Sequence, residues 1–315
     1  MFYLVILHFI FSLLSFVFSL LGILVSVAFI ILLERKVLGY IQIRKGPNKV
    51  GVLGVIQSFS DAIKLFIKEQ MIPLKSNIIL FYVSPCLSLF IVIFLWNVIP
   101  KLDNYLNFTL SGLFFFCCTR FSVYSIIGRG WSSNSNYSLI GAIRGIAQTV
   151  SYEVRLAVIF IRIIFLLNSY NLRFFCFEQK NMFFFILFIP IIIVWYISTL
   201  AETNRTPFDF AEGESELVSG FNIEYGSGGF ALIFLAEYAR IIFISYLIST
   251  LFFGGILYIS QILFNIVSFF FIFSIIWIRS CYPRFRYDKL ILLAWKLFLP
   301  VSLQFIIYFC LLRAF

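Results

Sequence analysis

The sequence predicts an all-α polytopic membrane protein with about eight transmembrane helices. Hydrophobic residues make up 62% of the chain and charged residues only 12%, and the mean hydropathy of +1.03 lies far outside the range of a soluble domain. The apolar runs are about 20 residues long, as membrane helices require, whereas a strand of a membrane barrel crosses the bilayer in about ten. We therefore expect a single integral membrane domain over residues 1–315.

Eight apolar runs are the predicted spans. They cover residues 2–33, 78–99, 106–127, 137–167, 182–200, 228–252, 255–278 and 290–312. No basic residue precedes the first run, so we interpret it as a retained first helix and not as a cleaved targeting segment.

The fourth span is unusual because it contains several charged residues. At 100° per residue, Gln148, Ser151, Arg155 and Arg162 lie within about 40° of Arg144 on one face, and Glu153 lies roughly opposite Arg144. Intramembrane charges usually face protein or a water-filled cavity. We therefore expect other helices to enclose this span, although the end of the Arg162 side chain could instead snorkel toward the outer interface.

The basic residues are distributed unevenly between the two sides of the predicted bundle. An even number of spans puts both termini on one side. The connections 34–77, 128–136, 201–227 and 279–289 then share a face and carry fourteen Lys and Arg residues, against four on the other face. By the positive-inside rule the first face is the cytoplasm or the mitochondrial matrix. The net charge of +10 follows from this asymmetry and favours anionic lipids and acidic partner surfaces over nucleic acid.

The basic inside loop, residues 34–77, is predicted to contain an interfacial amphipathic helix. Gly46, Pro47 and Asn48 form a turn motif. After it, polar and apolar residues separate onto two faces at helical spacing, with Asp61, Lys64 and Lys68 on one face and Ile63, Phe66, Ile67 and Met71 on the other. Such a helix could anchor the chain to lipid headgroups or form a docking surface for a partner protein.

The acidic inside loop, residues 201–227, is the clearest functional signal. Six of the fourteen acidic residues lie between Glu202 and Glu224, next to stretches that can cross a bilayer. Carboxylates crowded at a membrane boundary repel one another and lose hydration, so some should have raised pKa values and hold protons near neutral pH. This pattern favours proton handling.

Other residues restrict the chemistry that the chain can perform. Arg120 lies in the third span, and Glu237 and Arg240 lie three residues apart in the sixth, where a local ion pair is the simplest interpretation. The six cysteines contain no CxxC pair and the chain has one histidine. Because haem, zinc and iron–sulfur sites need more such ligands, we predict no metal site and no redox centre in this chain alone.

Five blocks of the sequence carry a family resemblance: Glu34–Lys36, Gln42–Gly51 (QIRKGPNKVG), Ala147–Glu153 (AQTVSYE), Ala201–Tyr225 and Pro283–Lys289 (PRFRYDK). In order and spacing they resemble the signature blocks of the NADH dehydrogenase subunit 1 family of respiratory complex I, over essentially the whole chain. The resemblance implies a core membrane subunit of the proton-pumping NADH:ubiquinone oxidoreductase, at the junction of the peripheral and membrane arms. This subunit would form the ubiquinone-access tunnel and supply the first carboxylates that couple quinone reduction to proton translocation.

The resemblance also implies roles for individual residues. The residues expected near the entrance or the charged middle of the quinone tunnel are Glu34, Arg35, Asp61, Lys64, Arg284 and Arg286. Those expected along the proton relay are Glu153, Glu202, Asp209, Glu212, Glu214, Glu216 and Glu237, with Arg205 balancing part of their charge. Reduction of ubiquinone would change the protonation of these acids, and glycines in the acidic loop would permit two arrangements of it.

Five arginines depart from the pattern of the family and have no assigned role. They are Arg120, Arg129, Arg155, Arg162 and Arg240. An arginine beside a carboxylate favours its ionised form, so one that reaches Glu153 or Glu237 would weaken the case for that acid as a relay. We predict that Arg155 points away from Glu153.

Cofactors, partners and location follow from the same resemblance. Ubiquinone would be the substrate, while NADH, FMN and the iron–sulfur clusters would belong to partner subunits of complex I. The other partners would be neighbouring membrane-arm subunits and membrane lipids such as cardiolipin. The expected location is the mitochondrial inner membrane, with an organelle-encoded chain, in preference to a bacterial plasma membrane.

Two other classes of protein share part of this pattern. A secondary transporter would also have intramembrane charges, but it should show internal repeats, and the two halves of this chain are not similar. A purely structural anchor would account for the basic loop and the apolar bulk. It would not account for the concentration of acids between Glu202 and Glu224.

Overall fold

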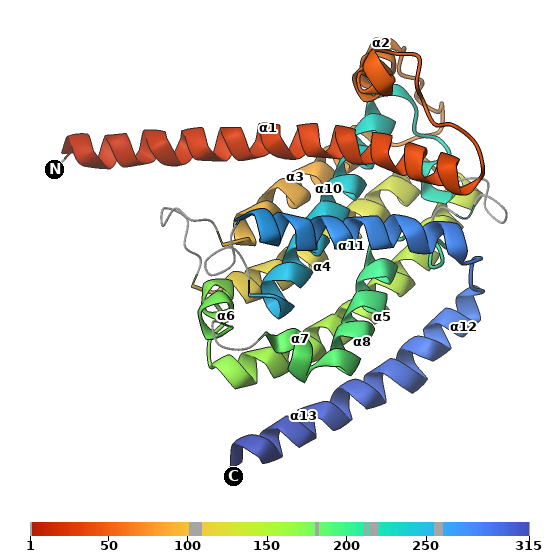
Figure 1. The fold of residues 1–315 in the computed structure, drawn as a ribbon. Coiled ribbons are helices and arrows are strands. Elements are labelled where there is room, and N and C mark those ends of the chain that lie inside the picture. Colours follow the sequence, from red (N-terminus) through yellow and green to blue (C-terminus); the bar gives the residue numbers. More distant parts are fainter. Residues whose placement is uncertain are drawn as a thin grey trace.

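The computed structural model describes residues 2–100, 109–179, 183–210, 213, 220–254 and 261–314, and over these residues its regular elements are all helices (Figure 1). The long helices are α1 (Phe2–Ile41), α3 (Ile78–Leu95), α4 (Ser111–Ser132), α5 (Asn136–Leu167), α10 (Ser227–Phe252) and α11 (Gln261–Cys281). A final rod joins α12 (Tyr287–Leu292), the π-helix η5 (Leu293–Phe298) and α13 (Leu299–Ala314). The shorter helices are α2 (Gln57–Ile67), α6 (Leu172–Glu178), α7 (Phe184–Leu187) and α8 (Ile189–Glu202), with 3-10 turns η1 (Val52–Gly54), η2 (Trp96–Val98) and η4 (Gly220–Asn222).

Six helices of the described chain are long and apolar enough to cross a membrane. They are α1, α3 with η2, α4, α10, α11 and the final rod. α5 is 32 residues long but carries several charges, and α8 has only 14 residues. The chain is therefore a multi-pass, all-α membrane protein, as predicted. The predicted eight spans correspond to the six clear ones together with α5 and α8.

Several predicted boundaries differ from the observed ones. α1 continues to Ile41, so Glu34 and Arg35 lie on a membrane helix and not in the basic loop. The third span runs later than predicted, from Ser111 to Ser132. The fifth is interrupted at Phe188, between α7 and α8, where a proline stands in the first turn of α8 and cannot donate a backbone hydrogen bond. Parts of the third, fifth and seventh predictions, residues 106–108, 182 and 255–260, lie outside the described residues.

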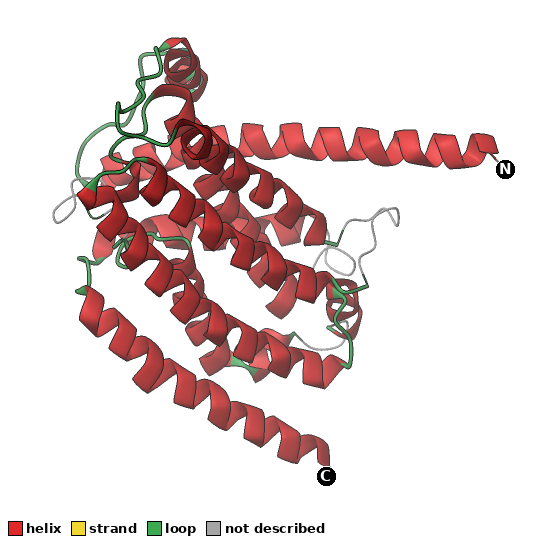
Figure 2. Ribbon diagram, turned by 180° about the vertical axis from the view of Figure 1, so that it is seen from behind, coloured by secondary structure: helices red, strands yellow, loops and turns green. Residues whose placement is uncertain are grey.

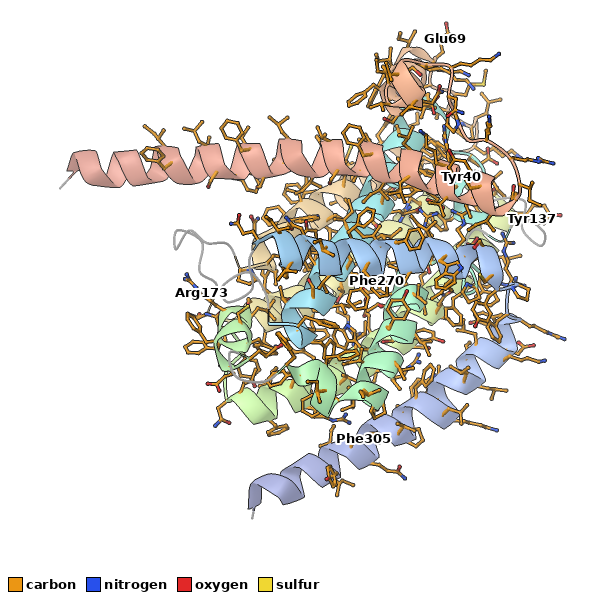
Figure 3. The ribbon with its side chains drawn as sticks, in the orientation of Figure 1. Tyr40, Glu69, Tyr137, Arg173, Phe270 and Phe305 are labelled. Carbon is orange, nitrogen blue, oxygen red and sulfur yellow. The ribbon has the colours of Figure 1, made fainter. Side chains whose placement is uncertain are left out.

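The connections of the bundle gather at two opposite ends. Both ends of the chain lie on the left in Figure 1, and the loops that follow α1 and precede α12 lie on the right. From behind, the loops near α2 lie together on the side away from both termini (Figure 2). In Figure 3, Tyr40 and Tyr137 mark this end and Arg173 marks the other. The basic and acidic connections thus share one end, as predicted for connections that follow the first and the fifth span.

α10 forms the centre of the bundle and belongs to both large apolar clusters. One cluster surrounds Phe115, Trp195 and Phe243, and the other surrounds Tyr152 and Ile242. Because most of α10 is buried, any charged side chain on it must face protein. The final rod lies along the edge of the bundle in Figure 1, and α13 packs on α5.

Candidate functional site

A buried carboxylate between α1, α10 and α11 is the centre of the first polar cluster. The Glu34 residue is 5% exposed, and its side chain forms an ion pair with Arg279 from the end of α11. The Tyr238 hydroxyl of α10 donates a hydrogen bond to the other oxygen of Glu34 at 2.6 Å. The Arg205 guanidinium lies over the Tyr238 ring, 4.4 Å from its centroid. All four residues line a cavity of about 10 Å³ whose other walls are isoleucines.

A second polar cluster occupies a cavity of about 30 Å³ between α3, α4, α8 and α10. Its charged lining residues are Arg129, Glu202, Glu237 and Arg240, and serines of α3 and α4 line it together with Thr203 and Asn204. A cavity of this size has room for one or two water molecules among several polar partners. Water in such a pocket would bring the ionisable side chains of three helices into hydrogen-bond contact.

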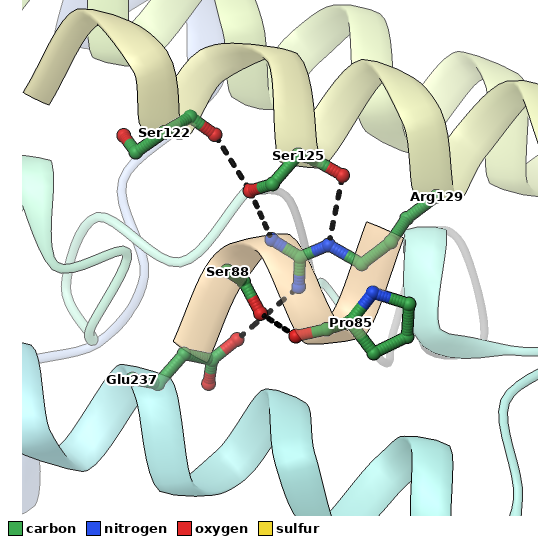
Figure 4. A network of polar contacts seen from close by, with 6 residues as sticks. All are labelled: Pro85, Ser88, Ser122, Ser125, Arg129 and Glu237. Atoms are coloured by element: carbon green, nitrogen blue, oxygen red, sulfur yellow. Dashed lines mark hydrogen bonds and ion pairs between the residues drawn. The ribbon is translucent and has the colours of Figure 1, made fainter. Parts of the chain in front are cut away.

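Arg129 connects α4 to α10 across this cavity (Figure 4). Its Nε donates to the Ser125 carbonyl at 3.2 Å and its Nη2 to the Ser125 hydroxyl at 3.4 Å. Its Nη1 lies 4.0 Å from the Glu237 carboxylate. The predicted local ion pair of Glu237 with Arg240 is therefore wrong, because Glu237 instead faces an arginine on a different helix.

Two acids of the interior, Glu153 and Glu202, are coupled through Arg240. Glu153 on α5 is 3% exposed and pairs with Arg120 of α4 at 3.0 Å. Glu202 at the end of α8 is 2% exposed. Arg240 interacts electrostatically with both Glu153 and Glu202, and the two acids also interact with each other. The positions of Glu153, Glu202 and Glu237 on three helices thus converge on one region.

Arg155 turns away from Glu153, as predicted. Its guanidinium lies over the Tyr152 ring, 3.6 Å from the centroid, and donates to the Ser151 carbonyl at 3.0 and 3.1 Å. The aromatic face and the carbonyl both stabilise a cation in a dry interior. The expectation that other helices enclose α5 is confirmed at this position.

Arg162 does not snorkel toward the outer interface. It is 1% exposed, donates from Nη2 to the Ser302 carbonyl at 2.5 Å, and lies over the Phe305 ring. α13 covers this face of α5, so the guanidinium finds its partners inside the protein. The snorkelling alternative is wrong because the final rod packs where lipid was expected.

The model of a protein family described as NADH dehydrogenase matches residues 14–310 of the chain. The chain belongs to the NADH dehydrogenase family. Over 287 residues it is 58% identical to NADH-ubiquinone oxidoreductase chain 1 of Aedes aegypti, covering 90% of each protein. Over 289 residues it is 48% identical to the protein of that name from Didelphis virginiana, covering 90% of this chain and 91% of the relative. The family predicted from the sequence blocks is confirmed.

The six residues expected near the quinone tunnel do not form one cluster in the structure. Arg35 on α1 pairs with Asp61 on α2, and both are partly exposed. Lys64 is an exposed residue of α2. Arg286 is well exposed and pairs with Asp288 at 3.0 Å. Glu34 lies in the first polar cluster, and Arg284 lies beside the acidic segment.

The described part of the acidic segment is firmly attached at both ends. Near its start, the Asp209 carboxylate lies 3.3 Å from Arg284, and the Phe285 backbone N–H donates to the Pro207 carbonyl at 3.1 Å. At its end, the Tyr225 hydroxyl forms hydrogen bonds with Ser84 and Ser132, each at 3.0 Å. The predicted relay residues Glu212, Glu214 and Glu216 lie outside the described residues.

The predicted amphipathic helix is present as α2. The apolar side chains of Ile63, Phe66 and Ile67 are exposed, and Met71 after the helix is also exposed. An exposed apolar face next to basic residues fits either lipid or a partner protein.

Metal-binding side chains are scarce in the described chain, where no three His, Cys, Asp or Glu residues are grouped to hold a metal ion. Cys176 on α6, outside the spans, is buried, and its burial raises the pKa of the thiol to about 12. This neutral thiol serves packing.

Sequence reasoning missed two residues of the first polar cluster, Arg279 and Tyr238. Arg279 was counted only as one base of an inside connection, although its place at the end of an apolar run was a usable signal. Tyr238 has no signal beyond its position beside Glu237. Their partnership with Glu34 joins positions more than 200 residues apart.

Proposed function

We propose that this chain is a core membrane subunit of a NADH:ubiquinone oxidoreductase, in which it forms the ubiquinone-access passage and the first acids of the proton route. The observation that carries the proposal is the pair of polar clusters on α10. Tyr238 belongs to the cluster around Glu34, and Glu237 belongs to the cavity that also holds Glu202. One central helix therefore contacts both groups of ionisable residues.

The first cluster has the chemistry that a quinone passage needs. Ubiquinone combines an apolar tail with a polar headgroup that accepts hydrogen bonds. The isoleucines around Glu34 provide an apolar wall, while Tyr238 and Arg279 provide donors. Polar groups that already have partners bind a passing headgroup weakly, which suits transit rather than storage.

Quinone reduction supplies the charge that the second cluster can sense. Reducing ubiquinone to ubiquinol takes two electrons and two protons, and NADH, FMN and iron–sulfur clusters in partner subunits would deliver the electrons. Negative charge near Glu34 acts strongly on neighbouring groups because the interior has a low dielectric constant. Coupled acids then change their protonation together.

Glu202 is the best-placed acid for proton exchange. Glu153 lies 3.0 Å and Glu237 4.0 Å from an arginine of α4, so each already has a cationic partner. Glu202 has no ion pair within the described chain, and its Oε2 is buried without a hydrogen-bond partner there. It also lines the cavity that has room for water.

The proposed setting is the mitochondrial inner membrane, with the basic and acidic connections toward the matrix. Other complex I subunits would cover the end of the bundle that carries α2 and the acidic segment. Lipids such as cardiolipin would contact the basic residues near the interface.

Photolabelling tests the passage. The intact membrane assembly of a tractable relative is irradiated with a photoreactive ubiquinone analogue, and the modified peptides are mapped by mass spectrometry. We expect labels that match residues 34–76 or 201–227 and that excess ubiquinone competes away. Labels confined to other subunits would contradict the passage.

Neutralising Glu202 tests the relay. Glu202→Gln keeps the shape and hydrogen-bonding capacity of the side chain but cannot exchange a proton, so we expect quinone-coupled proton pumping to fall at least about tenfold. Proton uptake by reconstituted vesicles measures this. The matched control is Glu178→Gln, an exposed acid on α6 at the opposite end of the bundle. Wild-type pumping in Glu202→Gln would favour a structural anchor.

A further inference from the structure

Gln148 on α5 joins two parts of the chain with a single buried amide. The residue is 0% exposed. Its Nε2 donates to the Ala201 carbonyl at 2.8 Å and to the Phe208 carbonyl at 2.7 Å. Ala201 lies in the last turn of α8, and Phe208 lies in the segment that follows.

The chemistry of the two acceptors fixes the orientation of this amide. Both are carbonyl oxygens, so only the NH₂ group of Gln148 can face them. A carbonyl oxygen has two lone pairs, and each of these two already accepts one backbone N–H, from Asn204 to Ala201 at 3.4 Å and from Phe210 to Phe208 at 3.2 Å. The NH₂ group of Gln148 therefore supplies a second donor to both carbonyls and ties α5 to two points of the chain that lie seven residues apart.

The two carbonyls lie beside charged residues of the proposed route. Glu202 directly follows Ala201, and Asp209 directly follows Phe208. The Phe208 ring also stacks on Phe285, with centroids 5.7 Å apart, so the same point joins the acidic segment to the connection before α12. A change at Gln148 would therefore move Glu202 without touching it.

We propose that Gln148 is a positioning residue that holds the Glu202 carboxyl against the cavity between α8 and α10. This inference rests on the proposed role of Glu202 in proton exchange. Gln148 itself exchanges no proton and contacts no substrate. It closes residues 201–208 into a fixed turn, so that the carboxyl stays in reach of the cavity.

The chain contains a matched amide at the opposite end of the bundle. Gln179, which follows α6, is also buried, and its Nε2 donates to the Thr250 and Leu251 carbonyls at 3.4 and 2.8 Å. It satisfies the end of α10 as Gln148 satisfies the end of α8. The two carbonyls that Gln179 binds lie at the end of α10, far from Glu237. A substitution of Gln179 therefore reports how the loss of such an amide affects packing alone.

The test compares four variants in the assembled enzyme of a tractable relative. Gln148→Met and Gln179→Met remove the donors while keeping a similar volume. Gln148→Glu and Gln179→Glu keep the shape but retain a donor only when the new carboxyl is protonated. Assembly, electron transfer from NADH to a water-soluble acceptor, ubiquinone reduction and proton pumping are measured for each from pH 6 to pH 8.5.

Gln148→Met is expected to lower coupled proton pumping about tenfold at all pH values, since the two carbonyls lose the side-chain donor that ties them to α5. Gln148→Glu is expected to pump better as the pH falls, because the protonated carboxyl donates to one of the two carbonyls while the ionised one repels both. Both variants should keep electron transfer to the water-soluble acceptor. Gln179→Met and Gln179→Glu should reduce assembly without a pH-dependent change in pumping per assembled enzyme.

Other charged and titratable groups near Gln148 also affect the pH profile of pumping. They are present in the wild type, so the wild-type profile is the control for their titration. These groups are Arg144 and Tyr152, each about one turn from Gln148 on α5, Glu202 and Asp209, which directly follow Ala201 and Phe208, Arg205 between them, and Arg284, which pairs with Asp209. Their titration changes the wild-type profile as well, so the difference between the two profiles isolates the new carboxyl.

The outcomes separate this inference from the proposed function. If Gln148→Met pumps normally while Glu202→Gln does not, the positioning role of Gln148 is overturned and the relay role of Glu202 stands. If both pump normally, the relay itself is overturned. If the pH profile of Gln148→Glu matches that of Gln148→Met, the residue has only a structural role and the positioning inference is wrong.

Discussion

Replacing Arg279 by methionine is expected to abolish ubiquinone reduction and to weaken the bundle. The change leaves Glu34, which is 5% exposed, with the Tyr238 hydroxyl but without its cation. Removing one partner of a buried ion pair destabilises by about 3 kcal/mol or more, because the remaining charge is left without compensation. The Arg279 side chain is about one-third exposed, so we expect a value at the lower end of that range. The amount of assembled enzyme and its ubiquinone reductase rate measure the effect.

A double-variant cycle separates the ion pair from general damage. Glu34→Gln combined with Arg279→Met removes both charges. This double variant should be more stable than Arg279→Met alone by about 1 kcal/mol or more. The control is Arg44→Met, an exposed arginine on the same end of the bundle, which should behave as wild type. Equal stability of the single and double variants would show that the ion pair with Glu34 contributes nothing.

The membrane class and most of the helices could be predicted from the sequence because lipid imposes a simple rule. Each apolar run must satisfy its own backbone, and a helix does so. The rule fails where charged residues lie on a helix because their partners are on other helices. Glu34 and Arg35 were assigned to a loop, yet α1 continues through them because Arg279 and Asp61 provide their partners.

The site was predicted in part for a similar reason. Helical periodicity correctly placed the charged face of α5 inside the bundle, since that depends only on spacing along one helix. It could not identify the partners, because Glu153 meets Arg120 and Arg162 meets Ser302 through the packing of separate helices. The same limit explains why the pairing of Glu237 with Arg129 was missed.

Enlarging Gly141 is expected to displace the end of the acidic segment from α5. A Cβ atom at this position would lie 2.8 Å from the Gly220 Cα atom and 3.0 Å from the Phe221 nitrogen. These are backbone atoms of η4, and Gly220 has φ 56°, a conformation that only glycine adopts easily, so the turn cannot adjust locally. The turn must move as a unit, and we expect Gly141→Ala to destabilise the packing by about 1–3 kcal/mol.

The displacement should also reach the proposed proton route. Phe221 lines the cavity that holds Glu202 and lies under the Arg129 guanidinium, 4.5 Å from the ring centroid. Moving Phe221 removes this contact and opens the cavity, so Gly141→Ala should lower both the temperature of thermal inactivation and the coupled pumping rate. Gly226→Ala is the matched control, because a Cβ atom at Gly226 meets no other group within 4 Å. If the two alanine variants lose stability and pumping to the same extent, close packing of η4 on α5 is not what holds the acidic segment in place.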